Sequence, residues 1–570
     1  MSDRGAKPVP DAASNAPSRV KSSRQPGLRR GFVFDGTAPL DCAMIARTAE
    51  TPQGPRVLAG ASRAVALAAG APVAQIYGPR SEPRATMRYP VVSNFVAGAS
   101  TAPATALLEV FDPSQGEVIS RVALSGPREV SDAVAAARQA FPAWSGTPLK
   151  DRVQVFFKYK ALLERYREDL ARLITDENGK IHSEAAAEVD RAVECAEFAC
   201  SLPQVAGGEI LEVSRGVDCR LERCPLGVVA SITPFNFPNM VPNWTIPNAI
   251  ALGNCMVLKP SELVPLSAVR IAELLSEAGL PAGVFNVVHG GKEAVEAICD
   301  HPDIAAITFV GSTKVAKAVY RRGTSQLKRV LALGGAKNHL IVMPDADREM
   351  AAGNIVASMS GCAGQRCMAA SVMVAVGATD PVIARMIEVA RQLVPGKTLG
   401  PVISAEAKAR IERYIDEAEA AGAKVILDGR GTVVPGKEGG FYVGPTVIDY
   451  VTPDMRIAQE EVFGPVLAIV RATTVDEAIA VENGSPYGNA AAIYTESGGI
   501  AKYVASRAQA GMIGVNVGVP VPREPFSFGG WNESKFGVGD ITGRGSIEFW
   551  TKSRKTTIKW HREAGVNWMS

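Results

Sequence analysis

The pattern of hydrophobic and polar positions changes near Met87. Residues 1–86 are rich in Ala, Pro, Ser and Arg, poor in acidic residues, and lack a sustained amphipathic period. This composition is typical of a disordered extension, or of translation begun upstream of a natural start at Met87. Arg- and Ser-rich leaders are also typical of organellar presequences. We expect a disordered extension on a cytoplasmic protein, with a mitochondrial-matrix location as the alternative.

After this segment, apolar residues recur first at helical spacing, at residues 131–141 and 153–173. From residue 228, short apolar runs alternate with helical stretches. The predicted strands are 228–232, 255–258, 284–288 and 305–310, followed by helices at 240–252, 268–278, 292–298 and after 313. Alternation at this short period predicts parallel strands with right-handed crossovers, which form a doubly wound nucleotide-binding sheet.

A second series of apolar runs follows Gly335. Residues 340–343, 371–375 and 466–470 are predicted strands of a second α/β domain. The alternating stretch 551–560 predicts one further strand. The predicted fold class is therefore α/β, with two doubly wound domains and a small β element.

Composition narrows the class of protein. The chain has 570 residues, of which 47% are hydrophobic and 21% charged, an ordinary globular composition. A net charge of +3 gives no reason to expect a nucleic-acid surface. The nine cysteines include no CxxC pair and the five histidines lack ligand spacing, so we expect a reduced protein without a metal site. Apolar runs fall short of the ~20 residues that span a membrane.

Polar residues follow three of the predicted strands, where ligands of parallel sheets bind. The segments are 233–238, 259–262 and 311–313. A lysine and a glutamate at 259 and 262 can hydrogen-bond both hydroxyls of a ribose, and Gly-Ser-Thr at a helix start favours a phosphate. Each is also a common turn or cap, and no GxGxxG is present. Three on successive strand ends together predict a nucleotide site.

Cys367 ends a glycine-containing stretch, Gly361-Cys-Ala-Gly-Gln-Arg-Cys367, before a predicted strand. A reactive cysteine needs an exposed loop with a lowered thiol pKa and nearby N–H donors, which such a loop can provide. A buried packing role is the commoner explanation of any single cysteine.

Six motifs, in order, resemble the aldehyde dehydrogenase superfamily over residues 92–560. They are Thr233-Pro-Phe-Asn236-Phe-Pro238, Lys259-Pro-Ser-Glu262, Phe309-Val-Gly-Ser312-Thr313, Leu333-Gly-Gly335, Gly364-Gln-Arg-Cys367 and Glu460-Glu461-Val-Phe463-Gly-Pro465. The resemblance implies an NAD-binding domain (87–205 and 226–334), a catalytic domain (335–530) and oligomerisation strands (206–225 and 545–562). It also implies that the last strand pairs across a dimer, within a homotetramer.

The resemblance assigns a role to each motif. Cys367 would attack the aldehyde carbonyl, and the Asn236 amide with the Cys367 backbone N–H would hold the oxyanion. Hydride would pass to the nicotinamide and leave a thioester. The implied NAD ligands are Thr233 and Phe235 in the cleft, Lys259 and Glu262 at the adenosine ribose, Ser312 at the pyrophosphate, and Glu461 and Phe463 at the nicotinamide. Because a 2′-phosphate would face Glu262, NAD is favoured over NADP.

One position departs from hydrolytic members of the superfamily, which carry a glutamate before the Leu-Gly-Gly turn. Here it is Ala332, which has no proton acceptor to activate water. A thiol needs little activation because its thiolate is a strong nucleophile, so the departure favours coenzyme A as acyl acceptor. The alternatives are a hydrolytic NAD(P)-dependent enzyme of other or broad substrate range and a non-catalytic protein that keeps the fold. Cys367 and Asn236 oppose the latter.

The same features resemble one subfamily, the CoA-acylating methylmalonate-semialdehyde dehydrogenases. Shared features are Pro234-Phe-Asn-Phe-Pro238, Gly335-Ala-Lys-Asn-His339, Arg366 before Cys367, and Val519-Pro-Val-Pro522. The resemblance implies methylmalonate or malonate semialdehyde as substrate and propionyl-CoA or acetyl-CoA as product, with loss of CO2. Arg366 and, by family alignment, Arg191 would bind the substrate carboxylate, with surface salt bridging as their alternative role. No nucleic-acid or membrane partner is expected.

Overall fold

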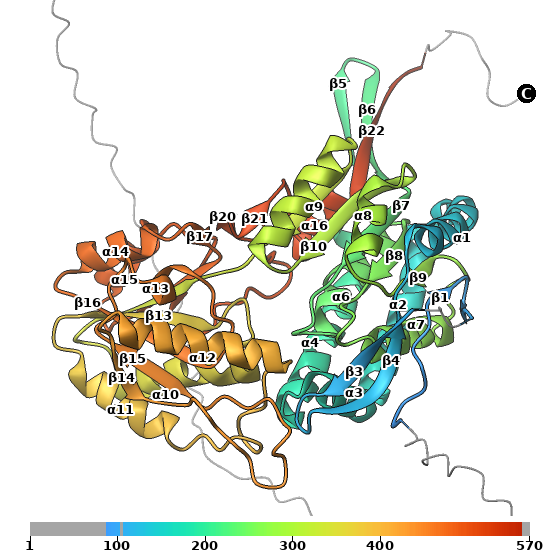
Figure 1. The fold of residues 1–570 in the computed structure, drawn as a ribbon. Coiled ribbons are helices and arrows are strands. Elements are labelled where there is room, and N and C mark those ends of the chain that lie inside the picture. The colour runs from blue at the N-terminus through green and yellow to red at the C-terminus, as the bar shows by residue number, and fades with distance from the viewer. Residues whose placement is uncertain (1–86, 103–105, 561–570) are drawn as a thin grey trace, which may run out of the picture. The chain divides into compact units, whose positions relative to one another are not determined.

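The computed structural model describes residues 87–102 and 106–560 (Figure 1). The predicted N-terminal extension, residues 1–86, lies outside the described residues. No helix in the described part of the chain is long and apolar enough to cross a membrane. Within the same residues, no group of three or more His, Cys, Asp or Glu side chains could hold a metal ion.

The first sheet has eight strands in the order β2-β1-β9-β8-β7-β10-β11-β21. The five strands from β9 to β11 are parallel, and the outer strands are antiparallel to their neighbours. The bounds are β1 Phe95–Val96, β2 Ala99–Ser100, β7 Val228–Ile232, β8 Cys255–Lys259, β9 Phe285–Val287, β10 Ile304–Val310, β11 Arg329–Leu333 and β21 Lys535–Phe536. The crossover helices are α6 Met240–Ala251, α7 Leu266–Glu277, α8 Lys292–Asp300 and α9 Thr313–Ser325. The doubly wound prediction is confirmed, with bounds within two residues of those expected.

The N-terminal part contains further helices. They are α1 Pro127–Gly146, α2 Leu149–Arg165, α3 Arg167–Asn178, α4 His182–Cys200 and the short α5 Leu202–Val205, with the hairpin β3 Leu107–Asp112 and β4 Glu117–Ala123 beside them. Of these helices, α1 packs on this sheet, and α2, α3 and α4 pack on the crossover helices α6 and α7. The stretch 153–173, expected to be helical, is divided between α2 and α3 because the chain leaves helical geometry at Tyr166 (φ −99°, ψ 18°). The Tyr166 ring lies 5.2 Å from the Arg165 guanidinium and 4.8 Å from that of Arg270 on α7. A tertiary contact thus accompanies a break that no Pro or Gly announces.

The second sheet has seven strands in the order β14-β15-β16-β13-β12-β18-β19, parallel except for β14. The strands are β12 Asn338–Val342, β13 Ala370–Val376, β14 Lys424–Leu427, β15 Thr446–Asp449, β16 Val466–Ala472, β18 Ala490–Tyr494 and β19 Met512–Val515. The helices are α10 Arg348–Ser360, α11 Asp380–Ala390, α12 Ala405–Ala420, α13 Arg456–Gln459, α14 Val475–Asn483 and α15 Gly498–Ala505, with a 3-10 turn at Gly361–Gly364. The predicted second α/β sheet is confirmed.

A third sheet has the order β22-β6-β5, with β5 Glu209–Ser214, β6 Val217–Pro225 and β22 Thr551–Lys559. The predicted late strand pairs with β6 along its whole length, from Thr551 opposite Pro225 to Lys559 opposite Val217. Every residue of β5 is exposed, and Figure 1 shows this hairpin projecting beyond α9 and α16 (Gly543–Trp550). The remaining short strands, β17 Tyr487–Gly488 and β20 Trp531–Asn532, pair with each other. Pairing of β22 across a dimer stays a prediction.

Candidate active site

A cleft of about 1650 Å³ lies at the carboxyl ends of β7, β8 and β10. Segments that follow neighbouring parallel strands meet at one edge of the sheet, so the three predicted polar segments come together there. Nine of the eleven predicted site residues line the cleft: Thr233, Phe235, Asn236, Lys259, Glu262, Ser312, Cys367, Glu461 and Phe463. Arg191 and Arg366 are not among its lining residues.

The end of β8 presents a lysine–glutamate pair to the cleft. Lys259 Nζ donates a hydrogen bond of 2.8 Å to Glu262 Oε2, and about a third of the Glu262 side chain (32%) is exposed. Beside them, the hydroxyl of Thr233 is buried and has no hydrogen-bond partner among the described residues. An unsatisfied buried hydroxyl is costly, so this wall of the cleft is chemically suited to a polar ligand such as a nucleotide ribose.

Ser312 precedes α9, a helix of 13 residues, and has the extended geometry of an N-cap (φ −65°, ψ 146°). Its side chain makes no capping hydrogen bond. Gly311 and Ser312 both line the cleft, so the helix N-terminus opens toward it. Free backbone N–H groups and the helix dipole favour an anion at this point.

The loop before Cys367 is left-handed at three consecutive residues: Cys362 (φ 51°), Ala363 (φ 52°) and Gly364 (φ 71°). A Cβ on Gly364 would lie 2.0 Å from the carbonyl oxygen of Gly464. Only glycine allows this approach without strain, because it lacks a Cβ and tolerates positive φ. The approach brings the Cys367 loop against the segment that carries Glu461 and Phe463.

Two amides that the sequence analysis did not single out hold the Cys367 backbone. Asn338 Nδ2 and Asn489 Nδ2 each donate a hydrogen bond of 2.8 Å to the Cys367 carbonyl oxygen. Asn338 belongs to the Gly335–His339 motif, so a sequence signal for it existed. Asn489 stands outside every motif quoted above, and only the pairing of β12 with β18 brings it to the loop.

Asn236 lies next to the same loop. Its Nδ2 donates to the Gln365 carbonyl oxygen at 2.9 Å, two residues before the thiol. The rings of Phe235 and Phe463 pack edge to face, with centroids 5.8 Å apart and an interplanar angle of 85°. The turn after β7 and the 461–463 segment therefore contact each other in the lining of the cleft that also contains Cys367.

Electrostatics at Cys367 disfavour the thiolate in the described state. Burial, with the nearby Glu461 carboxylate, raises the pKa of the Cys367 thiol to about 12. Burial also raises the pKa of Glu461 to about 7, against the opposing effects of the Ala336 N–H and of Lys337. A nearby carboxylate with a pKa near 7 can therefore change the charge around the thiol close to neutral pH.

Comparison with known proteins gives the site its context. Residues 100–556 match the Aldehyde dehydrogenase family. The chain belongs to this family. Malonate-semialdehyde dehydrogenase 1 of Geobacillus thermodenitrificans is 45% identical over 478 residues, which cover 82% of this chain and 99% of the relative. The malonate-semialdehyde dehydrogenase of Pseudomonas aeruginosa is 45% identical over 465 residues, covering 80% and 94%.

Solved structures agree with this assignment. The methylmalonate-semialdehyde dehydrogenase of Oceanimonas doudoroffii has a TM-score of 0.82 and 43% identity, and the match covers 83% of this chain and 99% of that one. A Sinorhizobium meliloti 1021 protein, provisionally named a methylmalonate-semialdehyde dehydrogenase and crystallised with NAD, has a TM-score of 0.82 and 42% identity, covering 85% and 100%.

In this aldehyde dehydrogenase the two predicted carboxylate-binding arginines pair with acids. Arg366 Nη2 lies 3.1 Å from Glu184 Oε1, and Arg366 Nε donates to Cys362 Sγ at 3.3 Å. A Cβ on Gly361 would lie 2.2 Å from Arg366 Nη1, so the guanidinium packs on bare backbone. Its orientation is therefore fixed by the loop beneath it.

Arg191 lies on α4, seven residues after Glu184. Its Nη1 is 2.5 Å from Glu194 Oε2 and 2.7 Å from Glu524 Oε2, and a tenth of its side chain (10%) is exposed. Glu524 lies two residues after the end of the Val519–Pro522 stretch. Arg191 therefore joins α4 to the late segment that the subfamily resemblance singles out.

Ala332 is fully buried on β11, the last parallel strand of the first sheet. It lies opposite Phe309 of β10 and Phe536 of β21. Its methyl group is not among the lining of the cleft. No proton acceptor is available from this position of the chain.

Proposed function

We propose that this aldehyde dehydrogenase oxidises malonate semialdehyde and methylmalonate semialdehyde with NAD and passes the acyl group to CoA. The observation that carries the proposal is a single cleft that joins Cys367 and Asn236 to the polar groups at the ends of β8 and β10. The 45% identity to malonate-semialdehyde dehydrogenases over most of the chain supports the substrate class.

In the first step, the Cys367 thiolate adds to the aldehyde carbon and the carbonyl oxygen becomes an oxyanion. The Asn236 amide stabilises this charge, as a donor already fixed in place. NAD, when bound, supplies the hydride acceptor that turns the adduct into a thioester on Cys367.

The carboxylate β to the thioester then leaves as CO2. The C–C bond breaks, its electrons delocalise into the thioester carbonyl as an enolate, and the α-carbon takes up a proton. The CoA thiolate attacks the carbonyl carbon and breaks its bond to Cys367 Sγ, which returns the thiolate. Malonate semialdehyde gives acetyl-CoA and methylmalonate semialdehyde gives propionyl-CoA.

The chain's own residues fit NAD. Lys259 and Glu262 would hold the adenosine ribose, and the orphaned Thr233 hydroxyl on the same wall would gain a partner. Ser312 and the N-terminus of α9 would receive the pyrophosphate. Glu461 and Phe463, with Phe235 packed against the latter, would position the nicotinamide ribose and ring. The Glu262 carboxylate would repel a 2′-phosphate, which favours NAD over NADP.

Arg366 and Arg191 are proposed to bind the substrate carboxylate. Arg366 adjoins the nucleophile, and its guanidinium is held in one orientation by Gly361 and Glu184. A guanidinium binds a carboxylate through two parallel hydrogen bonds and stays charged at any working pH. Existing acidic partners do not saturate five N–H donors.

We also propose a homotetramer in which β22 extends the three-stranded sheet of a neighbouring subunit. Exposed apolar side chains on β5 of the same sheet support this, because Ile210 and Leu211 are 72% and 67% exposed. A cytoplasmic location remains a prediction.

The deciding experiment measures NADH formation from malonate semialdehyde with and without CoA, and identifies the product. We expect multiple turnovers only with CoA, with acetyl-CoA and CO2 in equal amounts. Full turnover to a free acid without CoA would overturn the CoA-acylating proposal.

Hydrolysis is the second candidate function, and Glu461 is the observation that favours it. This carboxylate is close enough to Cys367 to raise the thiol pKa, and it could activate water in place of the glutamate missing at Ala332. The CoA experiment separates the two candidates, because only hydrolysis proceeds without a thiol.

A further inference from the structure

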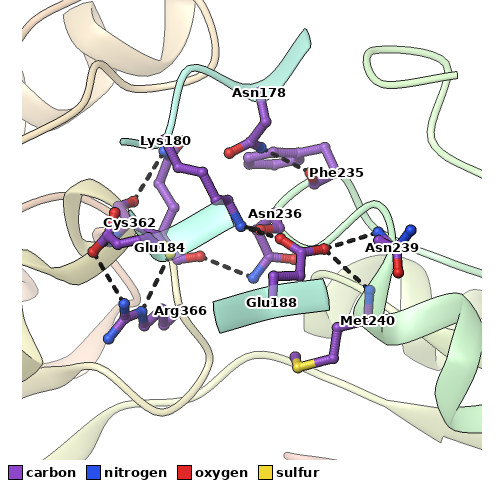
Figure 2. A network of polar contacts seen from close by, with 11 residues as sticks. Asn178, Lys180, Glu184, Glu188, Phe235, Asn236, Asn239, Met240, Cys362 and Arg366 are labelled. Carbon is purple, nitrogen blue, oxygen red and sulfur yellow. Dashed lines mark hydrogen bonds and ion pairs between the residues drawn. The ribbon is translucent and has the colours of Figure 1, made fainter. Parts of the chain in front are cut away.

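One face of helix α4 is directed at both the loop that carries Cys367 and the turn that carries Asn236. Glu184, Glu188 and Arg191 are spaced four and three residues apart, so they share a face of the helix. Glu184 accepts a hydrogen bond of 2.8 Å from the backbone N–H of Cys362, in the nucleophile loop (Figure 2). Glu188, one turn later, faces the turn that carries Asn236.

A buried ammonium lies beneath that turn. Lys180 Nζ donates to Glu188 Oε2 at 2.5 Å and to the carbonyl oxygen of Asn236 at 2.8 Å. The same nitrogen sits 4.1 Å from the centroid of the Phe237 ring. The two side chains are 1% and 0% exposed, so water does not compete for these contacts.

The other oxygen of Glu188 completes the attachment of the turn. Glu188 Oε1 accepts from the backbone N–H groups of Asn239 (2.8 Å) and Met240 (3.1 Å), where α6 begins. Asn178 Nδ2 donates to the Phe235 carbonyl oxygen at 2.9 Å. Figure 2 shows these bonds reaching the turn before, at and after Asn236.

We propose that Lys180 is a positioning residue for Asn236, and that Glu188 holds both the ammonium and the turn in register. The proposal rests on the oxyanion role proposed for Asn236. With its backbone carbonyl fixed by Lys180, Asn236 directs its amide at Gln365 O, beside the nucleophile. Through Glu184, the same helix fixes the Cys367 loop, so α4 sets the separation of donor and sulfur.

A buried ion pair is not needed merely to pack the interior beneath the turn. A buried ion pair recovers little net stability once desolvation is counted, and apolar residues of similar volume often do as well. Hydrogen bonds to a named carbonyl and two named N–H groups do supply direction. An oxyanion donor depends on direction, because its contribution is made only when it points at the developing charge.

The test compares Lys180→Met with Asn236→Ala and with the double variant. We expect Lys180→Met to lower kcat about 10²–10³-fold, the loss typical of one oxyanion-hole donor. The KM for NAD and the rate of Cys367 alkylation by iodoacetamide should stay unchanged, because neither involves an oxyanion. The double variant should be no slower than Asn236→Ala, because residues that act through one another are not additive.

A buried lysine elsewhere in the first sheet provides the matched control. Lys328 is 7% exposed and donates to the carbonyl oxygens of His301 and Ile304 at 2.5 and 2.9 Å, so Lys328→Met removes comparable backbone contacts. It should leave kcat near that of the wild type. Glu188→Gln, which keeps an acceptor oxygen for the turn, should show a smaller kcat loss that is again non-additive with Asn236→Ala.

Equal kcat losses in Lys180→Met and Lys328→Met, or additive losses in the double variant, would overturn the positioning role. Failure of Lys180→Met to fold leaves Glu188→Gln to decide by the same criterion. An Asn236→Ala variant with wild-type kcat would instead refute the proposed role of Asn236. A wild type that forms no NADH from semialdehydes would refute the proposed function itself.

Discussion

The Lys259–Glu262 pair at the end of β8 and the Lys180–Glu188 pair under the turn after β7 have the same chemistry in different surroundings. Nζ–O distances are 2.8 and 2.5 Å. Glu262 is about one-third exposed and lines the cleft, whereas Glu188 is completely buried. The first pair keeps free donor and acceptor capacity. The second pair uses its hydrogen-bond donors and acceptors to bind the backbone of the turn.

This difference in exposure suits the two charged pairs to different roles in one site. A pair at a cleft can exchange its internal hydrogen bond for bonds to a ligand at small cost, because water already competes with it. A pair without access to water cannot, because any broken contact leaves an uncompensated charge. Ligand binding is therefore expected of Lys259 and Glu262, and positioning of Lys180 and Glu188.

The largest expected difference is in stability. Lys180→Met leaves the Glu188 carboxylate buried without its cation and should lower the free energy of unfolding by about 3–5 kcal/mol. Glu262→Gln, at the cleft pair, should lower it by no more than about 1 kcal/mol. Urea denaturation followed by tryptophan fluorescence measures both. Similar losses of stability in the two variants would contradict the distinction between the buried pair and the cleft pair.

The exposure of Arg366 is intermediate between those of the two pairs. Its side chain is 23% exposed, and its guanidinium already contacts Glu184. If it binds substrate as proposed, Arg366→Leu should lower kcat/KM for malonate semialdehyde roughly 10- to 100-fold, the range for a charge-assisted hydrogen bond, mainly through KM. Propanal, which has no carboxylate, should be affected far less, and Arg191→Leu should behave similarly. Equal effects on both substrates would indicate that these arginines have a structural role and do not bind the substrate carboxylate. Arg385→Leu, at a surface ion pair, is the control.

Glu461 is a carboxylate in the cleft whose charge affects the pKa of the Cys367 thiol. Glu461→Gln removes a charge that raises the Cys367 pKa, so alkylation of Cys367 should accelerate by up to about tenfold, the change expected for one pKa unit. Because the pKa of Glu461 is about 7, the acceleration should appear above that pH and vanish below it, where wild-type Glu461 is already neutral. An unchanged alkylation profile would show that burial alone raises the thiol pKa.

The smallest expected effect is on cofactor affinity. Glu262→Gln weakens one hydrogen bond to the adenosine ribose and should raise the KM for NAD several-fold with little change in kcat. Removing the carboxylate should at the same time improve the use of NADP relative to NAD. A variant whose NADP use does not improve would place the ribose elsewhere. Glu273→Gln, at an exposed ion pair on α7, should leave both unchanged.

Sequence reasoning reached the strands of both sheets because parallel strands buried on both faces appear as uninterrupted apolar runs. Every residue of β7 and β8 is buried, as such runs predict. The break between α2 and α3 was missed because Tyr166 carries none of the usual helix-ending signals. Lys180 and Glu188 were missed because lysine and glutamate are almost always exposed, and nothing local marks the exceptions.

The sequence by itself determined the order of strands and helices, and its motifs singled out Cys367, Asn236 and the Lys259–Glu262 pair, which the fold brings to one cleft. These follow from local patterns and from motifs short enough to read along the chain. Only the tertiary structure decided that Asn236 lies against Gln365, that Arg366 meets Glu184, and that Lys180 is enclosed below the turn. Such contacts join segments between 56 and 182 residues apart. They depend on sheet order and helix packing, which set burial and therefore the strength of each charge.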